Sequence, residues 1–595
     1  MKRSLVIAFI SLLSTLVAFS QEVTITDAYS GIPLEGVVIT LGGSVTQSNS
    51  RGKATLSHFP EQGELLFTHP SYHLLRIEIQ RLPQMKYRVR MVEAPLSLEE
   101  VVVSVSRGEQ LRFTVPRKVE SLPSRLLTRA HPPTTADLTG LSGEVFIQKS
   151  QQGGGSPMIR GFSVNRLLLV LDGVRMNNAI YRSGNLQNIV SVDANMLEMT
   201  EILPGPGSVA YGSDALGGVL SFITHKPKLS TSEKMISEGY CRVRLFSAEQ
   251  GGTLHFRWGA GAEKWGFLLG GTRSVFGNLR MGRHGPAEYL RNEYTLPSLF
   301  SGRDSIVRNN NPRMQRPTAY NQTNLTSRVR YKPSPQLEIN LGGQFSGTSA
   351  VPRYDRLIVY RKDKLRYGDW HYGPQEWTLV NGSIDYHPAN PLFDKVRIIP
   401  AYQYYAESRH DRSIDDPLLF NRKEKLHIYT LSVDFHKELL PAIRFSFGTE
   451  GTFNKVISRG WSTHLLTGET LASAPRYPAL SHYASVAGYL SGHWEALPEL
   501  SLEGGIRGTL THTDGEFSSE SGFPESSFSQ TNRAVNGSLG TVWRPFPEWL
   551  FRALASTGFR APNIDDIAKV FDSEPGNVIV PNPTLKPEYA RNLEA

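Results

Sequence analysis

The sequence predicts a mainly β protein: a small β-sandwich, then an α+β domain, then an antiparallel transmembrane β-barrel. Three observations predict this class. Of 595 residues 39% are hydrophobic and 20% charged, and the mean hydropathy is −0.28, which is too polar for a bundle of apolar membrane helices. Glycines punctuate the middle of the chain, and alternating polar and apolar residues fill the part after about residue 238. Such alternation is typical of strands that cross a membrane within a closed barrel.

The N-terminus predicts export. Met1-Lys2-Arg3 is basic, residues 5–19 are almost wholly apolar, and Ala18-Phe19-Ser20 offers a small-x-small cleavage site. Residues 1–20 are therefore predicted to be a secretory signal peptide, because the apolar run is too short to span a bilayer.

Cysteine and charge exclude several classes of protein. Cys241 is the only cysteine, so an internal disulfide, a thiolate zinc cluster and a CxxC redox pair are all excluded. The net charge of +9 is dispersed along the chain instead of gathering into one basic arm. No nucleic-acid partner is therefore expected.

Residues 21–95 predict a small β-sandwich, since short β-branched runs alternate with turn signals. Residues 31–39 (GIPLEGVVI), 52–56 (GKATL) and 67–72 (FTHPSY) resemble the carboxypeptidase-regulatory-like domain. The resemblance implies a fold and no peptidase activity.

A β-prone segment at residues 98–105 precedes a polar, proline-bearing linker at 106–120. The segment is either the last strand of the sandwich or a strand whose free edge pairs with a partner protein.

Residues 121–228 predict a compact α+β domain with tight turns, because closely spaced glycines separate short apolar strands such as 167–171.

Residues 238–595 predict the barrel. Leu254, Phe256, Trp258 and Ala260 share one strand face while His255 and Arg257 take the other. Aromatic residues recur near strand ends, as interfacial girdles require: Trp258, Trp265, Trp377, Tyr386, Tyr483, Trp494, Trp543 and Trp549.

Connections are predicted to alternate between tight turns and long loops. Tight turns are expected at 261–264, 332–335, 439–441 and 544–548, and long loops at about 275–323, 347–376, 408–424 and 455–478. Short turns on one side and long loops on the other are typical of outer-membrane barrels. A soluble β-sandwich or propeller is the alternative.

Three motifs in the middle domain resemble the plug of TonB-dependent outer-membrane receptors: residues 159–162 (IRGF), 171–174 (LDGV) and 201–220 (EILPGPGSVAYGSDALGGVL). The resemblance implies that residues 121–228 form a plug inside a barrel of roughly 22 strands. The plug-motif residues are then Arg160, Gly161, Asp172, Gly173, Glu201, Gly205, Tyr211, Gly212, Gly217 and Gly218.

The same resemblance implies a partner. Residues 98–105 look like the TonB box, which adds a strand to TonB and so couples the receptor to an inner-membrane energising complex. The residues expected to bind TonB are Leu98, Glu99, Glu100, Val101, Val102, Val103, Ser104 and Val105.

A buried Arg and Glu cluster between plug and barrel is a further feature of the family. Arg160 is expected either to pair with an inward-facing barrel carboxylate such as Glu450 or to be satisfied within the plug.

The sequence indicates the ligand only coarsely. Residues 558–562 (GFRAP) and 582–588 (NPTLKPE) resemble boxes of haem receptors, and 175–188 resembles haem-receptor plugs, yet Asn185 stands where several of these have histidine. Tyr181, Arg182 and Asn185 are expected to contact ligand, and His284, His371 and His410 are either haem ligands or solvated loop residues. Seven arginines against three acidic residues in loop 275–323 favour an anionic ligand, or else lipopolysaccharide or plain solvation.

The hypothesis is therefore a TonB-dependent receptor of the Gram-negative outer membrane that imports a scarce nutrient, an iron complex (ferric siderophore or haem) first. A cobalamin importer, a surface ligand-binding or signalling receptor without transport, and a passive porin are the alternatives. No catalytic residue, metal site or cofactor is expected, because the P-loop lysine, HExxH and GxSxG are all missing. With about 13 strands and the start of another, the chain is expected to lack about eight C-terminal strands, as a truncated product or a fragment.

Overall fold

A computed structural model describes residues 22–28, 30–41, 44–60, 62–69, 72–92, 101–102, 107, 110–149, 151–182, 188–297, 303–521, 527–546, 549–569, 571–574 and 577–595. The predicted signal peptide lies outside these residues. The chain divides into two compact units, Met1–Val101 with Leu111–Phe113 and Val102–Gln110 with Thr114–Ala595.

The first unit consists of two small sheets around one apolar core. One sheet has the order β4-β1-β7 and the other β3-β2-β5-β6. The strands are β1 (Glu22–Asp27), β2 (Val38–Leu41), β3 (Ser44–Gln47), β4 (Lys53–Thr55), β5 (Glu64–His69), β6 (Tyr72–Glu78) and β7 (Arg88–Met91). Alternate residues such as Val23, Ile25, Leu65 and Phe67 are fully buried between the sheets, as the two-residue period of strands requires. The resemblance to the carboxypeptidase-regulatory-like domain stays a prediction.

The second unit begins with a domain built on a five-stranded sheet of order β10-β16-β17-β14-β15, in which β14 and β17 are parallel. Its strands are β10 (Glu120–Pro123), β14 (Leu167–Leu171), β15 (Val174–Arg175), β16 (Leu197–Pro204) and β17 (Gly218–Thr224). Three short helices and a small sheet complete it: α2 (Ser124–Ala130), α3 (Thr135–Gly140), α4 (Ser208–Tyr211), β11 (Phe146–Gln148), β12 (Ser156–Ile159) and β13 (Phe162–Ser163). We call this domain the plug.

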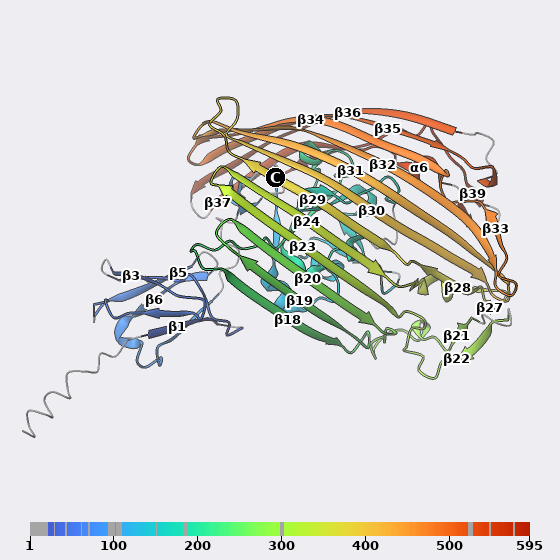
Figure 1. The fold of residues 1–595 in the computed structure, drawn as a ribbon, viewed down its shortest axis with the longest axis horizontal. Coiled ribbons are helices and arrows are strands. Elements are labelled where there is room, and N and C mark those ends of the chain that lie inside the picture. Colours follow the sequence, from blue (N-terminus) through green and yellow to red (C-terminus); the bar gives the residue numbers. More distant parts are fainter. Residues whose placement is uncertain are drawn as a thin grey trace, which may run out of the picture. The chain divides into compact units, whose positions relative to one another are not determined.

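The rest of the unit is a 17-stranded antiparallel sheet, which we call the wall (Figure 1). Its strands follow one another in sequence order; β25 (Val351–Pro352), β28 (Tyr367–Tyr372) and β33 (Thr470–Ser473) are short, and fourteen others make up most of the sheet. They are β18 (Ile236–Phe246), β19 (Gly251–Gly261), β20 (Trp265–Phe276), β23 (Tyr320–Ser334), β24 (Leu337–Thr348), β29 (Glu376–Tyr386), β30 (Lys395–Ser413), β31 (Leu418–Leu440), β32 (Ile443–His464), β34 (Leu480–Leu497), β35 (Leu500–Glu516), β36 (Ser527–Phe546), β37 (Trp549–Arg560) and β40 (Glu588–Glu594).

Small elements lie in the connections between wall strands. They are β21 (Glu293–Leu296), β22 (Ser305–Arg308), α5 (Tyr354–Leu357), β26 (Tyr360–Arg361), β27 (Lys364–Leu365), α6 (Ile564–Ile567), β38 (Phe571–Glu574) and β39 (Asn577–Ile579). Before the plug, β8 (Val101–Val102) pairs with β9 (Gln110–Leu111). In the described part of the chain no helix is both long and apolar enough to cross a membrane.

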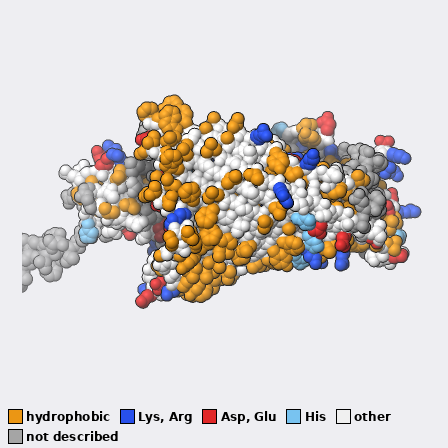
Figure 2. All heavy atoms as spheres, turned by 90° about the horizontal axis from the view of Figure 1, so that it is seen from above, with side chains coloured by type: hydrophobic (Ala, Val, Ile, Leu, Met, Phe, Trp, Pro, Cys, Tyr) orange, Lys and Arg blue, Asp and Glu red, His pale blue; other side chains and the backbone are white. Residues whose placement is uncertain are grey.

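Wall strands present apolar residues outward and polar residues inward. On β19, Leu254 and Phe256 are half exposed whereas His255 is fully buried, which confirms the alternation expected for this strand. Figure 2 shows hydrophobic side chains gathered over part of the face in view, with few charged side chains among them.

The aromatic prediction is only partly right. Trp265, Tyr386, Trp494, Trp543 and Trp549 are exposed next to short turns. Trp377 and Tyr483 instead face inward, because each lies opposite a buried polar residue of the neighbouring strand. Both rings pack with plug residues.

The two ends of the wall differ in their connections. One, the short-turn end, carries turns such as 262–264, 335–336, 441–442 and 498–499. The other, the long-loop end, carries 277–319, 349–375 and 465–479. The long loop expected at 408–424 is wrong: β30 and β31 stay paired as far as Asp411↔Phe420 and turn within 414–417. Their polar outer halves continue the ladder, so hydrophilicity alone did not indicate a loop.

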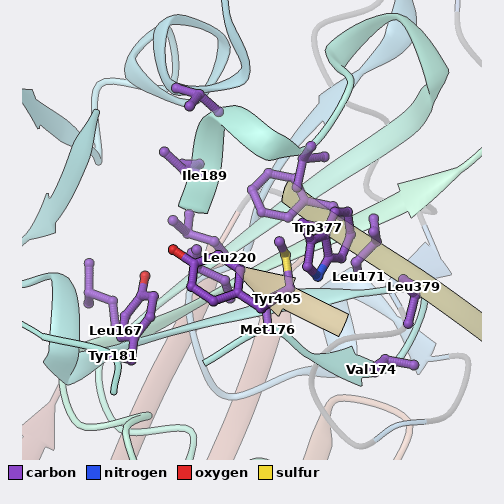
Figure 3. Close-up of a cluster of buried hydrophobic side chains, with 14 of the residues drawn as sticks. Leu167, Leu171, Val174, Met176, Tyr181, Ile189, Leu220, Trp377, Leu379 and Tyr405 are labelled. Atoms are coloured by element: carbon purple, nitrogen blue, oxygen red, sulfur yellow. The ribbon is translucent and has the colours of Figure 1, made fainter. Parts of the chain in front are cut away.

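The plug lies in the curve of the wall (Figure 1), and plug side chains hydrogen-bond strands from β18 to β40. Leu171, Val174 and Met176 of the plug form one apolar cluster with Trp377, Leu379 and Tyr405 of the wall (Figure 3). The predicted linker is also partly buried, because Val115 and Val119 lie in an apolar cluster with plug residues.

Candidate functional site

A buried ion-pair cluster between the segment before the plug and the wall centres on Arg107. Its Nη1 donates to Ser432 Oγ at 2.7 Å, its Nη2 pairs with Glu450, and Asp434 Oδ1 lies 3.6 Å away. Its guanidinium also lies 5.2 Å from the centre of the Tyr211 ring. Burial alone would lower the pKa of Arg107, but attraction by Glu450 and Asp434 raises it above the ordinary value. Arg107 is therefore a charged, buried anchor just after the predicted TonB box.

Glu450 joins this anchor to a second arginine. Arg507 Nη2 lies 3.2 Å from Glu450 Oε1, and Arg507 Nη1 donates to the carbonyl oxygen of Ala210 in α4 at 3.2 Å. A carboxylate held by two arginines is satisfied on both oxygens, which offsets part of the cost of burying the charges.

Arg160 does not reach this cluster. Its Nη2 donates to Glu594 Oε1 of β40 at 2.8 Å. Arg160 thus pairs with a wall carboxylate, as one of the two expectations had it, but the carboxylate is Glu594 and not Glu450. Glu450 instead holds Arg107 of the segment before the plug. Arg107 was missed because 343 residues separate it from Glu450; a lone arginine beside the predicted TonB box was its only signal.

The Asp172-Gly173 motif forms a tight turn between β14 and β15. Both residues have positive φ, 49° and 86°, as the two central positions of a type I′ hairpin turn require. The Asp172 carboxylate accepts the backbone N–H of Thr224 at 2.9 Å and pairs with Arg328 of β23. This motif thus shapes the plug and also ties it to the wall.

The glycine-rich motif packs α4 against the plug sheet. A Cβ on Gly217 would lie 2.2 Å from Phe162 Cβ, and Gly212 ends α4 with a φ of 78° beside the Arg507 guanidinium.

Glu201 is fully buried on β16, and the Gly205 N–H donates to the Gly217 carbonyl at 3.0 Å. Gly218 on β17 lies opposite Pro204 of β16, and Gly161 has a φ of 83° with open space around it.

A second charged cluster lies toward the long-loop end, where Arg182 of the plug meets the wall. Arg182 Nη1 donates to both oxygens of Glu407, at 2.8 and 3.1 Å, and Arg409 Nη2 donates to Glu407 Oε1 at 2.7 Å. Burial opposes the charge of Arg182, but attraction by Glu407 raises its pKa well above the ordinary value. This salt bridge keeps Arg182 charged where plug and wall meet.

An arginine cage surrounds Tyr372 in the same cluster. The guanidinium carbons of Arg353, Arg409 and Arg182 lie 4.8, 5.8 and 5.9 Å from the centre of its ring. Among the described residues, Arg409 Nε and Nη1 are buried without a hydrogen-bond partner, as is Glu424 Oε2. We call Tyr372, Arg353, Arg409 and Arg182, together with Glu407 and Glu424, the arginine cluster. The spare donors of Arg409 suit an anionic group.

Other predicted ligand residues have different positions. Tyr181 is buried, and its carbonyl oxygen accepts from Asn563 Nδ2 at 2.6 Å; Asn185 lies outside the described residues. His371 and His410 stack at 4.6 Å, and their Nδ1 atoms bond to Asp369 and Asn421. Within the described ranges no group of three or more His, Cys, Asp or Glu residues could hold a metal ion.

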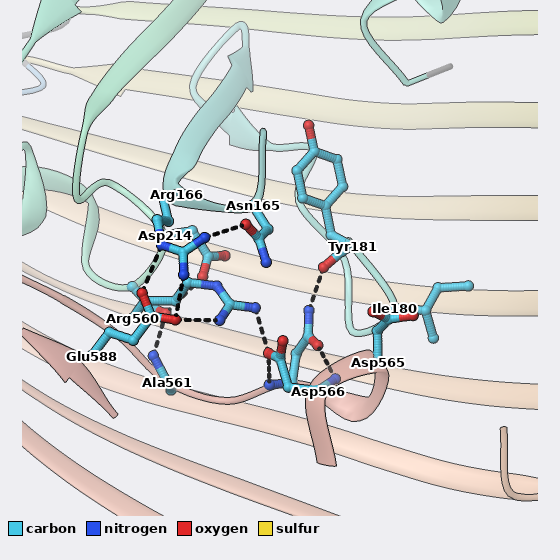
Figure 4. Close-up of polar contacts among 12 residues, drawn as sticks. Asn165, Arg166, Ile180, Tyr181, Asp214, Arg560, Ala561, Asp565, Asp566 and Glu588 are labelled. Carbon is cyan, nitrogen blue, oxygen red and sulfur yellow. Dashed lines mark hydrogen bonds and ion pairs between the residues drawn. The ribbon is translucent and has the colours of Figure 1, made fainter. Parts of the chain in front are cut away.

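The 558–562 motif lies against the plug. Arg560 lies between Glu588 and Asp566, while Arg166 of the plug donates to both Glu588 oxygens at 2.7 and 2.9 Å (Figure 4). The backbone N–H of Ala561 donates to Ser213 Oγ at 3.0 Å. The residues that resemble a haem-receptor box thus hold plug and wall together here.

The predicted TonB-box residues are mostly outside the described part. Leu98, Glu99, Glu100, Val103, Ser104 and Val105 lie outside it, whereas Val101–Val102 form β8. Binding of these residues to TonB stays a prediction.

Comparison with known proteins decides the family. Residues 112–219 match the TonB-dependent Receptor Plug Domain, and residues 343–595 match the β-barrel of the TonB dependent receptor-like family. The chain is a TonB-dependent receptor with plug and β-barrel domains. TonB-dependent receptors are outer-membrane proteins.

Relatives of this receptor differ in what they bind. It is 24% identical over 464 residues to the vitamin B12 transporter BtuB of Vibrio vulnificus, covering 75% of this chain and 59% of that protein. It is 25% identical over 358 residues to a hemin receptor of Yersinia pestis, covering 58% and 48%. The receptor chain thus spans about half to three-fifths of the length of these relatives.

A solved structure supports the fold. The copper transporter OprC superposes with a TM-score of 0.60 at 13% identity, covering 78% of this receptor and 65% of that chain. A likeness at this identity concerns the fold alone.

Proposed function

We propose that this receptor imports a metal chelate with acidic groups across the outer membrane, driven by TonB. A ferric siderophore or haem is the first candidate and cobalamin the alternative. The observation that carries the proposal is the plug held in the curve of the wall by buried ion pairs, with the arginine cluster toward the long-loop end.

The relatives support a metal chelate. One is a vitamin B12 transporter and another a hemin receptor. Both compounds are metal macrocycles; haem carries two propionates and cobalamin a single phosphodiester. Arginine binds carboxylates and phosphates through paired donors, so Arg182 and its neighbours suit such a ligand. Tyr181 and Asn185 complete the proposed ligand contacts.

The proposed organisation follows the sequence. Residues 1–20 direct export, 21–95 form the accessory sandwich, 98–105 are the TonB box, 121–228 the plug, and the barrel begins at about 238. In this arrangement the short-turn end faces the periplasm, where TonB and its inner-membrane energising complex reach the box. The long-loop end faces outward, and lipid contacts the apolar outer face of the wall.

The testing experiment is growth rescue of an uptake-deficient strain that expresses the receptor, with ferric siderophores, haem and cobalamin supplied one at a time. Deletion of residues 98–105 is expected to abolish uptake while surface binding of the rescuing compound persists. Uptake that survives the deletion would contradict the TonB mechanism. Binding without rescue would favour a surface or signalling receptor, and conductance of receptor-containing liposomes without energy input would favour a porin.

A further inference from the structure

A cavity of about 140 Å³ lies between the plug and the wall near the short-turn end. Asp172, Gly173 and Ser221 line it from the plug, and Asn340, Ser383 and Arg397 are among the lining residues of β24, β29 and β30. Inward-facing wall residues and the plug sheet thus leave room between them on this side.

Four buried polar atoms at this cavity have no hydrogen-bond partner among the described residues: Arg107 Nε, Arg328 Nε, Asn340 Oδ1 and Asn381 Oδ1. Arg107, Arg328 and Asn381 are each less than one-tenth exposed. Buried groups of this kind are normally satisfied by water or by a polar solute. The cavity is therefore suited to a hydrated guest.

The cavity is lined by charges of both signs. Arg107, Lys226, Arg328 and Arg397 line it together with Asp172 and Asp434, and Glu450 and Asp385 pair with Arg107 and Arg397 from outside the lining. A charged solute in the cavity would therefore meet both donors and acceptors.

Toward the long-loop end the cavity is closed by apolar contacts. Ile399 lines the cavity and also belongs to the cluster that contains Trp377, Leu379 and Tyr405 of the wall and Met176 of the plug (Figure 3). A charged compound passes such a contact only if plug and wall separate there.

We infer that the imported compound crosses the receptor along the β24–β29–β30 side of the wall, and that this cavity is the exit half of its route. The inference rests on the proposed import. Arg107 connects the route to the energy source, because it lines the cavity and closely follows the predicted TonB box. Withdrawal of Arg107 from Glu450 enlarges the cavity, and release of Asp172 from Arg328 then frees the plug from this side of the wall.

The test fills the cavity. Ser383→Trp places a large ring on its β29 wall, and the matched control Ser491→Trp fills a different lumen pocket of about 320 Å³ near the short-turn end. We expect S383W to lower energised uptake of the rescuing chelate (ferric siderophore, haem or cobalamin) at least about tenfold with surface binding unchanged, and S491W to change uptake less than about twofold.

Charge reversal supplies a second variant. Lys226→Glu in the cavity is expected to slow uptake of an anionic chelate, whereas Lys264→Glu in the exposed turn 262–264 is expected to leave it unchanged.

If S383W is poorly assembled, Ser383→Cys in a Cys241→Ser receptor allows a methanethiosulfonate reagent to add the bulk after folding. Normal uptake after modification, or equal losses in S383W and S491W, would overturn the route. Failure of the unmodified receptor to import any of the three compounds would instead refute the proposed import.

Discussion

Glu407 of β30 and Glu424 of β31 are direct cross-strand partners on the inner face of the wall. Like charges in this position repel one another, and burial increases the cost. Arg182 and Arg409 both donate to Glu407, so the plug itself supplies part of the compensating charge. The arginine cluster therefore links the outer side of the plug to the wall.

This link predicts the role of Arg182 in binding. Arg182→Gln keeps Glu407 bound to Arg409 and to the Tyr405 hydroxyl, but removes one positive charge from the cluster. We expect the affinity for an anionic chelate to fall about tenfold, because a charge-assisted hydrogen bond contributes about 1.5–3 kcal/mol. Equilibrium binding to isolated outer membranes measures this effect.

The control for that variant is Arg283→Gln, which removes an exposed arginine of loop 277–319 outside the cluster. Equal losses of affinity in R182Q and R283Q would show that general loop charge, not the cluster, attracts the ligand.

Arg107 is predicted to hold the plug in place. Arg107→Ala leaves Asp434 and Glu450 with one cation fewer, and breaking a buried ion pair costs about 3–5 kcal/mol. We expect earlier thermal release of the plug and higher conductance in liposomes. Arg166→Gln breaks the pair with Glu588, whose side chains are 33% and 38% exposed, and is expected to cost no more than about 1 kcal/mol. A smaller effect for R107A than for R166Q would contradict this assignment.

Two glycines of the plug motifs are predicted to respond differently to alanine. At Gly217 an added Cβ would lie 2.2 Å from Phe162 Cβ, whereas at Gly161, with a φ of 83°, nothing lies within 4 Å. Gly161→Ala therefore adds only backbone strain of about 1–2 kcal/mol, while Gly217→Ala forces plug elements apart. The yield of folded, heat-resistant receptor is expected to fall sharply for G217A alone, and similar yields would refute this steric argument.

Trp377 is predicted to seal the plug against the wall. Trp377→Ala removes a ring that is 4% exposed, and truncation of a buried aromatic costs about 3–5 kcal/mol. Larger liposome conductance is expected because the apolar contact is opened. Trp258→Ala, at a ring 45% exposed on the outer face, is the control, and equal conductance of the two variants would show that the contact does not seal the lumen.

Local pattern was enough to predict some features and not others. The alternation around His255 indicated which residues face outward, because strand faces follow a period of two. The plug motifs were recognisable because their turns depend on local backbone geometry, as at Asp172-Gly173. The same period cannot say whether an aromatic such as Trp377 faces outward or toward the plug, since apolar side chains lie on both sides of the wall. Partners such as Glu450 for Arg107 depend on how distant strands meet, which no local pattern encodes.

The plug and the segment before it are attached to the wall by separate ion pairs. These pairs are made by Arg328, Glu407, Glu450 and Glu588 on different strands. Charged groups that part can be hydrated as soon as water reaches them, so each attachment can be undone without the others. A pulling force on the plug would then break these ion pairs one after another. The same charged groups could pair again when the force ends. The same set of ion pairs thus keeps the lumen closed at rest and lets the plug return after it has been pulled.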